Sequence, residues 1–197
     1  MIKLFDKWDI SNIAIDDLGL RDYIGLKPMI IPRTFGRNVT YRFWRSKTNI
    51  VERLMNKLMV TGHKGKKHKT SSSQFSGKGM CVYNIVFKAF EMIEKQLNKN
   101  PVEVFVKAVE NAAPREEITA IEYGGARYPQ AVECAPQRRV DIVLRQMTQG
   151  AYAKSFNKKV SITKALAEEI MKAYRIDQGS QAISKKLELE RQADSAR

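Results

Sequence analysis

Apolar residues recur at helical spacing in several segments of this chain, and most of these segments begin at a recognisable helix-start signal. Asn49, Asn100 and Ser161 each precede such a segment, at the position where a short polar side chain caps a helix. Glu52 supplies the acidic half of a capping box, and Pro101 suits the first position of its helix. The pattern predicts helices over residues 49–61, 80–98, 100–114, 136–150 and 161–175, with a weaker sixth helix over 181–197.

The apolar stripes of these helices predict one hydrophobic core. Leu54, Phe90, Phe105, Leu144 and Ile170 are typical members, each on the apolar side of its own helix. The sixth helix is weakly amphipathic, and its predicted docking residues are Ile183, Leu187 and Leu189. We therefore predict an all-α fold, a single bundle of about six helices.

Between the third and fourth helices lies the pattern of a β-hairpin, at about residues 117–134. The pair Gly124-Gly125 separates two extended runs, and Gly-Gly favours the primed turns, which need positive φ. We expect residues 118–123 to pair with 128–134, with Pro129 suiting an edge. Because a lone hairpin is marginal in water, it must lean on helices or be held by a partner. The predicted packing positions of the ribbon are Ile121, Tyr123, Tyr128 and Val132.

The rest of the chain predicts three regions around one core. Residues 1–48 form an N-terminal extension, irregular over 1–32, with Ile and Leu residues that pack on the body. Residues 49–178 form the helical domain that carries the hairpin, and residues 179–197 form a helical tail.

Charge changes the picture, because the formal net charge of +14 is gathered in two blocks. Residues 33–80 hold 12 Lys and Arg against 1 acid, and residues 138–164 hold 7 against 1. Such blocks form basic surfaces that attract a polyanion. The alternative is a solvated face kept soluble by repulsion, but a block with so few acids destabilises itself without a partner.

Two segments of the first block favour nucleic acid. In residues 33–47, arginines alternate with aromatic residues, so guanidinium groups can meet phosphates while rings stack on unpaired bases. The alternative for this segment is an edge strand with its aromatics turned inward. The following loop, residues 62–79, is rich in Lys, Gly and Ser, and it can become ordered against phosphates.

No catalytic or metal site is predicted. Cys81 and Cys134 are too few for a disulfide framework, and they fit a reducing compartment. Cys81 is expected to be a packed side chain, and helix-face carboxylates such as Glu168 and Glu169 are expected to be solvated. His63 and His68 have no third ligand nearby, so plain loop histidines are favoured. We expect no cofactor, no signal peptide and no membrane span.

Several motifs occur here in the order found in a known family. They are Val109-Glu110-Asn111, Pro114-Arg115, Gly124-Gly125-Ala126, Tyr128 with Pro129, and Arg138-Arg139. On these motifs, residues 49–175 resemble the small-subunit ribosomal protein seven family. The proline directly after Tyr128, the segment 1–47 and the tail resemble its archaeal and eukaryotic branch.

The resemblance implies a non-enzymatic constituent of the cytoplasmic ribosome. It implies binding to the 3′ major domain of small-subunit rRNA, nucleation of head assembly, and a hairpin near the exit-site tRNA and the mRNA path. The implied partners are rRNA, transiently tRNA and mRNA, and neighbouring ribosomal proteins, with a monomer off the ribosome. A basic DNA-binding regulator is the alternative from another class, although residues 150–159 are too long for a helix-turn-helix.

The predicted site residues follow from the basic segments of the sequence and from the family resemblance. The rRNA contacts that the resemblance implies are Lys64, Lys66, Lys67, Lys69, Arg115, Arg138, Arg139 and Arg145. The two basic segments add Arg42, Arg45, Lys47, Lys154 and Lys158. The resemblance places the tip residues Tyr123, Gly124, Gly125, Ala126 and Arg127 toward tRNA and mRNA.

Overall fold

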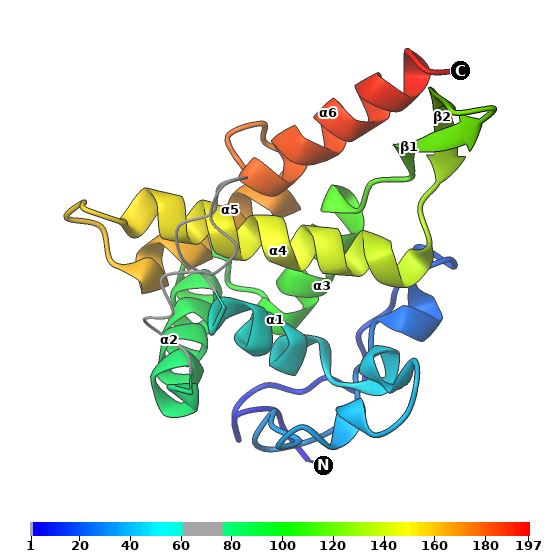
Figure 1. Cartoon of the computed structure of the whole chain (residues 1–197). Coiled ribbons are helices and arrows are strands. Elements are labelled where there is room, and N and C mark those ends of the chain that lie inside the picture. Colours follow the sequence, from blue (N-terminus) through cyan, green and yellow to red (C-terminus); the bar gives the residue numbers. More distant parts are fainter. Residues whose placement is uncertain (1, 61–76) are drawn as a thin grey trace.

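A computed structural model describes residues 2–60 and 77–197, in which helices surround one core and a hairpin projects from one corner (Figure 1). The helices are α1 (Ile50–Leu58), α2 (Gly79–Leu97), α3 (Pro101–Ala112), α4 (Pro136–Ser155), α5 (Ile162–Tyr174) and α6 (Gln181–Asp194). The hairpin strands are β1 (Glu116–Tyr123) and β2 (Ala126–Glu133). Three short 3₁₀ turns precede α1: η1 (Arg21–Tyr23), η2 (Arg37–Val39) and η3 (Trp44–Lys47). The predicted all-α bundle with a hairpin is confirmed.

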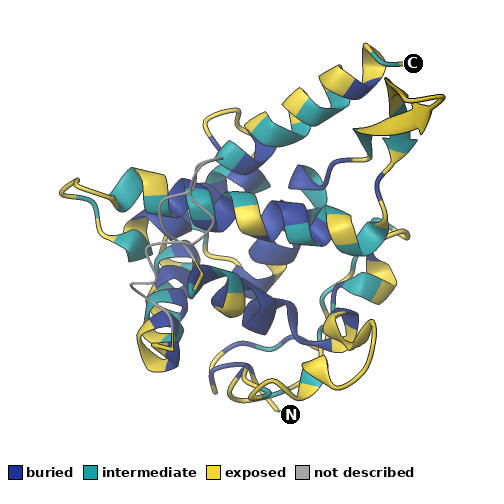
Figure 2. Cartoon of the chain, in the orientation of Figure 1, coloured by how far each residue is buried: buried dark blue, intermediate teal, exposed yellow. Residues whose placement is uncertain are grey.

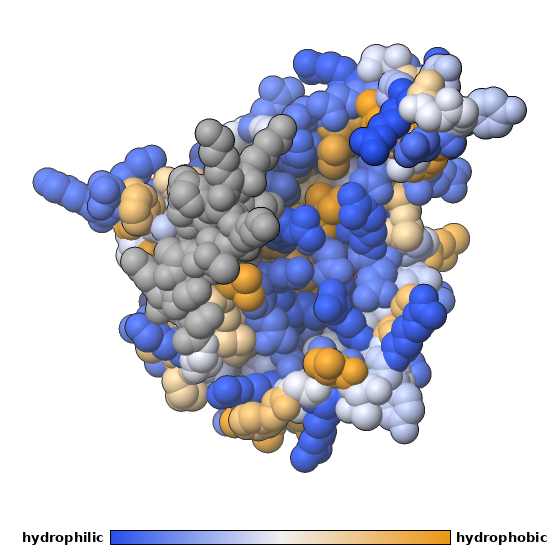
Figure 3. Space-filling view, viewed as in Figure 1, coloured by the Kyte–Doolittle hydropathy of each residue, from blue (hydrophilic) through white to orange (hydrophobic). Residues whose placement is uncertain are grey.

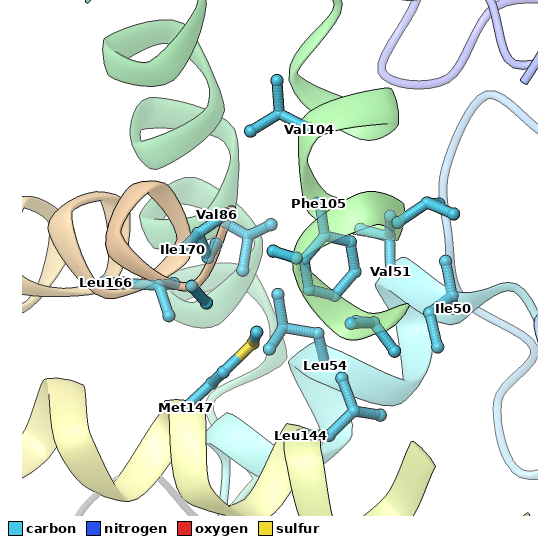
Figure 4. Packing of buried hydrophobic residues seen from close by; sticks show 14 of the residues in the cluster. Ile50, Val51, Leu54, Val86, Val104, Phe105, Leu144, Met147, Leu166 and Ile170 are labelled. Atoms are coloured by element: carbon cyan, nitrogen blue, oxygen red, sulfur yellow. The ribbon is translucent and has the colours of Figure 1, made fainter. Parts of the chain in front are cut away.

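The core lies where α5 packs against α2, α3 and α4. Phe105 of α3, Leu54 of α1, Leu144 of α4 and Ile170 of α5 converge there, and all four are fully buried (Figure 4). These residues come from the apolar stripes that the periodicity predicts. Burial of each such side chain stabilises the fold by about 1.5–3 kcal/mol.

The helix starts follow the capping signals, with one exception in detail. The side chains of Asn49, Asn100 and Ser161 each accept a hydrogen bond from a backbone N–H of the first turn. The predicted capping box of Glu52 is wrong. Glu52 Oε1 instead accepts from the backbone N–H and the hydroxyl of Thr34, at 2.8 and 2.6 Å. The carboxylate is buried, so it stabilises the docking of the N-terminal segment rather than the helix start.

The N-terminal segment is irregular, as predicted, and it closes one side of the core. Leu4, Trp8 and Leu20 are buried there. Trp8 packs on Phe90 of α2, with ring centroids 5.8 Å apart. A bridge between Gly25 and Asn49 leads the segment into α1. These residues belong to the same hydrophobic cluster as the helices.

The hairpin has the predicted two-residue turn. Gly124 and Gly125 have φ of +59° and +79°, and Tyr123 pairs with Ala126 across them. The predicted packing positions are mostly wrong, since Ile121, Tyr123 and Tyr128 are exposed. The outer part of the hairpin ribbon has the colour of exposed residues in Figure 2. β1 contacts α6 instead, and Arg197 forms an ion pair with Glu116 at 2.5 Å. The ribbon therefore leans on a helix at its base and projects freely at its tip.

The helix α4 does not break at Gly150, as the sequence pattern predicts, but continues to Ser155. A side-chain carbon at Gly150 would lie 3.0 Å from Cβ of Gln181 and 3.1 Å from Cδ of Glu169. The glycine therefore allows α4 to approach α5 and the start of α6. Its cost in helix propensity, about 1 kcal/mol relative to Ala, is offset by this packing.

Two other predictions for this region are wrong. Glu169 is fully buried rather than solvated. Its carboxylate accepts from Lys154 Nζ at 2.5 Å, from Ser180 Oγ at 2.8 Å and from the backbone N–H of Gln181 at 2.6 Å. Of the predicted docking residues of the tail helix, Ile183 is buried as predicted, together with Ala182 and Ala193, and Leu189 is partly buried, but the prediction for Leu187 is wrong because that side chain is exposed. The buried carboxylate thus joins α4, α5 and the start of α6.

Candidate nucleic-acid interface

The segment of residues 33–47 is a series of tight turns beside the start of α4. It contains η2 and η3 and no strand, so the edge-strand alternative is wrong. Phe35 and Phe43 have φ of +52° and +66°, a region that bulky residues rarely adopt. Both rings are exposed rather than turned inward, at 79% and 66%. The turns of this segment thus place both aromatic rings on the protein surface, exposed to solvent.

Arginines accompany these rings. The guanidinium of Arg33 lies 4.7 Å from the ring centroid of Phe35, and that of Arg42 lies 5.1 Å from Phe43. Cation–π contacts of this kind hold a long side chain over a ring while its N–H groups stay available. The interleaving of cations and rings in the sequence is therefore also an interleaving in space.

A hollow separates residues 38–45 from the first half of α4. Arg42 and Arg45 line it on one side and Arg138 and Arg145 on the other. Residues nearly a hundred positions apart thus form one surface, which we call the arginine hollow. Figure 3 shows a largely hydrophilic surface on one face of the molecule, where α4 crosses the view in Figure 1.

Asp141 connects the arginine hollow to the body of the protein. Its carboxylate lies 3.3 Å from Arg45, 3.4 Å from Arg53 and 3.8 Å from Lys57. Arg53 is buried and also donates to the backbone carbonyl of Tyr23 at 2.8 Å. Burial holds the pKa of Arg53 and of Lys57 below their ordinary values, and the charge of Asp141 opposes this shift. One carboxylate thus joins the N-terminal segment, α1 and α4.

Sequence reasoning missed Asp141 as a member of this site. The signal was present, because Asp141 is the one acid in the second basic block. A lone acid among many bases is a candidate for an internal ion pair rather than for solvent.

At the base of the hairpin, two neighbouring arginines have different surroundings. Arg138 makes a two-pronged contact with Glu117 of β1, at 2.5 and 2.6 Å, and its side chain stays 55% exposed. Arg139 is 11% exposed and donates to Asp17 at 2.8 Å and to the Pro114 carbonyl at 2.9 Å. Burial alone would raise the pKa of Asp17, but the contacts of Arg139, together with the Gly19 N–H and the charge of Arg115, lower that pKa. Arg139 therefore fastens the N-terminal segment to the body.

The tip of the hairpin is exposed throughout residues 121–130. Tyr123 is 81% exposed, and Arg127 makes an ion pair of 3.6 Å with Glu122 on the surface. The two tip glycines have no side chain that could keep a ligand away from the backbone. Apart from the adjacent residues, no heavy atom of the described residues lies within 4 Å of the position that a Cβ would take at Gly124 or Gly125. The backbone of the turn is open to close approach.

The other predicted contacts are distributed as follows. Lys47, Arg115 and Lys158 are exposed, and Lys158 lies beyond the end of α4, away from the residues that line the arginine hollow. Lys154 is half-buried and donates to Glu169 and to the carbonyl of Gly179, at 2.5 and 3.2 Å. Lys64, Lys66, Lys67 and Lys69 lie outside the described residues. The arginine hollow thus gathers four of the predicted contacts, and rRNA binding by any of them stays a prediction.

Among the described residues, which do not include His63 and His68, groups that could support catalysis or bind a metal are scattered. Cys81 is exposed, so its prediction as a packed side chain is wrong. Cys134 is buried, and burial raises the pKa of its thiol to about 11, which leaves it protonated and unreactive at neutral pH. Within residues 2–60 and 77–197, no three His, Cys, Asp or Glu side chains are grouped to hold a metal ion. No helix in the same ranges is long and apolar enough to cross a membrane.

Comparison with known proteins gives consistent similarities. A sequence model of the family described as ribosomal protein S7p/S5e matches residues 20–197. The chain is 55% identical over 196 residues to the small ribosomal subunit protein uS7 of Nanoarchaeum equitans, covering 100% of this chain and 99% of the relative. It is 48% identical to the protein of that name from Methanosphaera stadtmanae, covering 98% of both. Identity to the one from Methanothermobacter thermautotrophicus is 47%, covering 100% of both.

Proposed function

Because the chain belongs to the ribosomal protein S7p/S5e family, whose members are structural and non-enzymatic, we propose that it builds the small ribosomal subunit by binding the 3′ major domain of the rRNA. The family and its archaeal relatives confirm the resemblance found in the sequence. They make the chain a ribosome-associated, cytoplasmic protein with ribosomal proteins as neighbours.

The arginine hollow is the observation that supports rRNA binding best. Arg42, Arg45, Arg138 and Arg145 come from two distant segments and line the same surface. Arginine matches phosphate through paired N–H donors, and clustered cations release counterions when RNA binds. If these arginines only kept the protein soluble, they would not need to meet on one surface from distant segments.

The packing of the N-terminal segment against the helices supports a second part of the proposal, namely that this segment takes part in rRNA recognition. The N-terminal region contributes buried residues such as Leu4 and Leu20 to the core and residues 38–45 to one side of the arginine hollow, while the helical domain contributes residues 135–145 to the other side. We assign rRNA recognition to both regions together, with residues 179–197 bracing the hairpin. Binding of this surface to a folded RNA junction would nucleate assembly of the subunit head.

For the hairpin we propose a contact with exit-site tRNA and with mRNA. Its exposed glycine tip allows backbone amides to approach phosphates closely, and its base is held by α6 and Arg138. Deletion of residues 123–127 is expected to leave rRNA affinity within about twofold and to alter tRNA or mRNA binding in reconstituted subunits. Loss of all rRNA binding would contradict this role.

The test of rRNA binding is a titration of the full chain, expected to be monomeric when free, against a transcript of the 3′ major domain at increasing salt. If about 8 phosphates are neutralised, log K falls against log salt with a slope of about −6 to −7. A transcript of another rRNA domain of equal length is the control for specificity. Duplex DNA tests the regulator alternative.

Two results would contradict the proposal. The first is an affinity for the 3′ domain that hardly changes with salt. The second is an affinity for duplex DNA at moderate salt that equals or exceeds the affinity for the folded RNA.

A further inference from the structure

The arginine hollow contains more than a phosphate-binding surface requires. Besides its four arginines, its lining includes the ring of Phe43, the apolar side chain of Ile142, and the side-chain amides of Asn38 and Gln137. Phosphate contacts require cations and N–H donors, whereas a flat aromatic ring and an apolar wall serve a different ligand. A ring, an apolar surface and amides together match the faces and the edge of a nucleobase.

Phe43 is presented in an unusual way. It adopts φ of +66°, a conformation that costs a bulky residue free energy, and the ring it carries remains 66% exposed. A ring that is so exposed gains little burial energy in return. Arg42 lies over the ring, while Tyr41 and Trp44 pair with each other at a centroid distance of 4.3 Å. Strain without burial is expected where a ring serves a ligand.

Some polar groups of the arginine hollow are already paired within the protein, and others are available to a ligand. Asp141 is engaged by Arg45, Arg53 and Lys57, so its carboxylate is neutralised by the protein. Gln137 accepts from Ser46 Oγ at 3.4 Å through its amide oxygen, which leaves its NH₂ group as a donor. Arg145 is exposed and has no ion pair among the described residues. The available groups are thus donors that suit the acceptor atoms of a base and its phosphate.

We infer that the arginine hollow receives one unpaired base of the RNA, stacked on Phe43 and contacted along its edge by Gln137, with its phosphate held by Arg145. This inference rests on the proposed rRNA binding and names a subsite within it. An apolar peptide is a poorer match, because four arginines line the arginine hollow and an uncharged partner would leave them without a countercharge.

The experiment compares the full-length protein with Phe43→Ala and Phe43→Trp on the 3′ domain transcript. Affinity and salt slope are measured, and chemical probing reports the reactivity of each unpaired base. Phe156→Ala is the matched control, because Phe156 is also an exposed ring at 52% but lies outside the arginine hollow. Phe43 has little buried surface, so the variants are expected to fold, and circular dichroism checks this.

Phe43→Ala is expected to weaken binding between about 5-fold and about 150-fold, the range found when a base-stacking aromatic is replaced. It should also restore the reactivity of one unpaired base while the rest of the protection pattern stays. The salt slope should be unchanged, because no charge is lost. Phe43→Trp keeps a stacking surface and should retain the protection, and Phe156→Ala should change neither measurement.

The outcomes separate the two claims. If wild-type protein does not bind the 3′ domain with a steep salt dependence, the proposed function fails. If wild-type protein binds and Phe43→Ala gives the same affinity and protections, the base subsite is wrong while rRNA binding stands. Loss of a neighbouring ribosomal protein's binding without any change in base protection would assign the arginine hollow to a protein partner and overturn the inference.

Discussion

Glu168 and Glu169 show how far the environment of a residue can depart from its type. Both are carboxylates on α5, one position apart. Glu168 is partly exposed and lies 4.0 Å from Lys164, whereas Glu169 is fully buried between Lys154, Ser180 and the start of α6. Burial of a carboxylate costs free energy that several hydrogen bonds and one cation must offset. Glu169 therefore determines how α6 begins, and Glu168 does not.

At the residue scale, Glu169→Ala is expected to lower the free energy of unfolding by about 2–4 kcal/mol, since it removes the buried carboxylate that accepts from Lys154, from the Ser180 hydroxyl and from a backbone N–H of α6. Glu168→Ala is the matched control and should change it by no more than about 0.5 kcal/mol. Urea denaturation followed by circular dichroism measures both. Equal effects of the two substitutions would show that the buried contacts contribute little.

At the scale of elements, the hairpin is stabilised by its own strand pairing and by α6 rather than by packing into the core. Its strands pair along eight residues each, but its outer half is exposed on both faces and its base is braced by α6. Formation of the hairpin also depends on the turn, because both of its residues must adopt positive φ. A change at the turn should therefore open the ribbon without unfolding the helices.

We predict that Gly124→Val opens the hairpin, because a β-branched residue at positive φ costs roughly 1–2 kcal/mol. Gly124→Asn should keep it, since Asn-Gly favours the same turn. Amide hydrogen exchange provides the measurement. In the valine variant, exchange should quicken in β1 and β2 and stay unchanged in α2 to α5, and faster exchange throughout the bundle would contradict this local role.

At the scale of the whole molecule, the positive charge performs two separate tasks. Arg53 is buried and Arg139 is largely buried, and they tie the N-terminal segment to α1 and α4 through Asp141 and Asp17. Arg42 and Arg145 are exposed beside the arginine hollow. Basic residues that lie close in the sequence therefore differ in their effects: some stabilise the fold, and others remain available to a polyanion.

Arg139→Ala and Arg145→Ala should accordingly give opposite results. Arg139→Ala is expected to lower the free energy of unfolding by about 1–3 kcal/mol, because Asp17 and the Pro114 carbonyl lose their donor. Arg145→Ala should leave stability within about 0.5 kcal/mol and reduce the salt slope of rRNA binding by about 0.7–0.9. Denaturation and titration of both variants test the contrast. A stability loss at Arg145 equal to that at Arg139 would remove the distinction.

Much of this protein was predictable from local signals. Asn49, Asn100 and Ser161 mark helix starts because capping needs only neighbouring backbone groups, and Gly124-Gly125 marks the turn because positive φ is a property of single residues. Apolar periodicity identified the core faces, and the two basic blocks indicated a polyanion partner. Each of these properties acts within a few residues of the chain.

The tertiary structure decided which distant groups meet. Asp141 and Arg53 are 88 positions apart, and Asp17 and Arg139 are 122 apart, so their pairing is set by how helices and segments pack. The same packing lets α4 continue through Gly150 and buries Glu169, although propensity and polarity at those positions favour the opposite. Local sequence therefore determined the elements and the sign of the charge. Long-range packing determined which charges hold the protein together and which remain available to RNA.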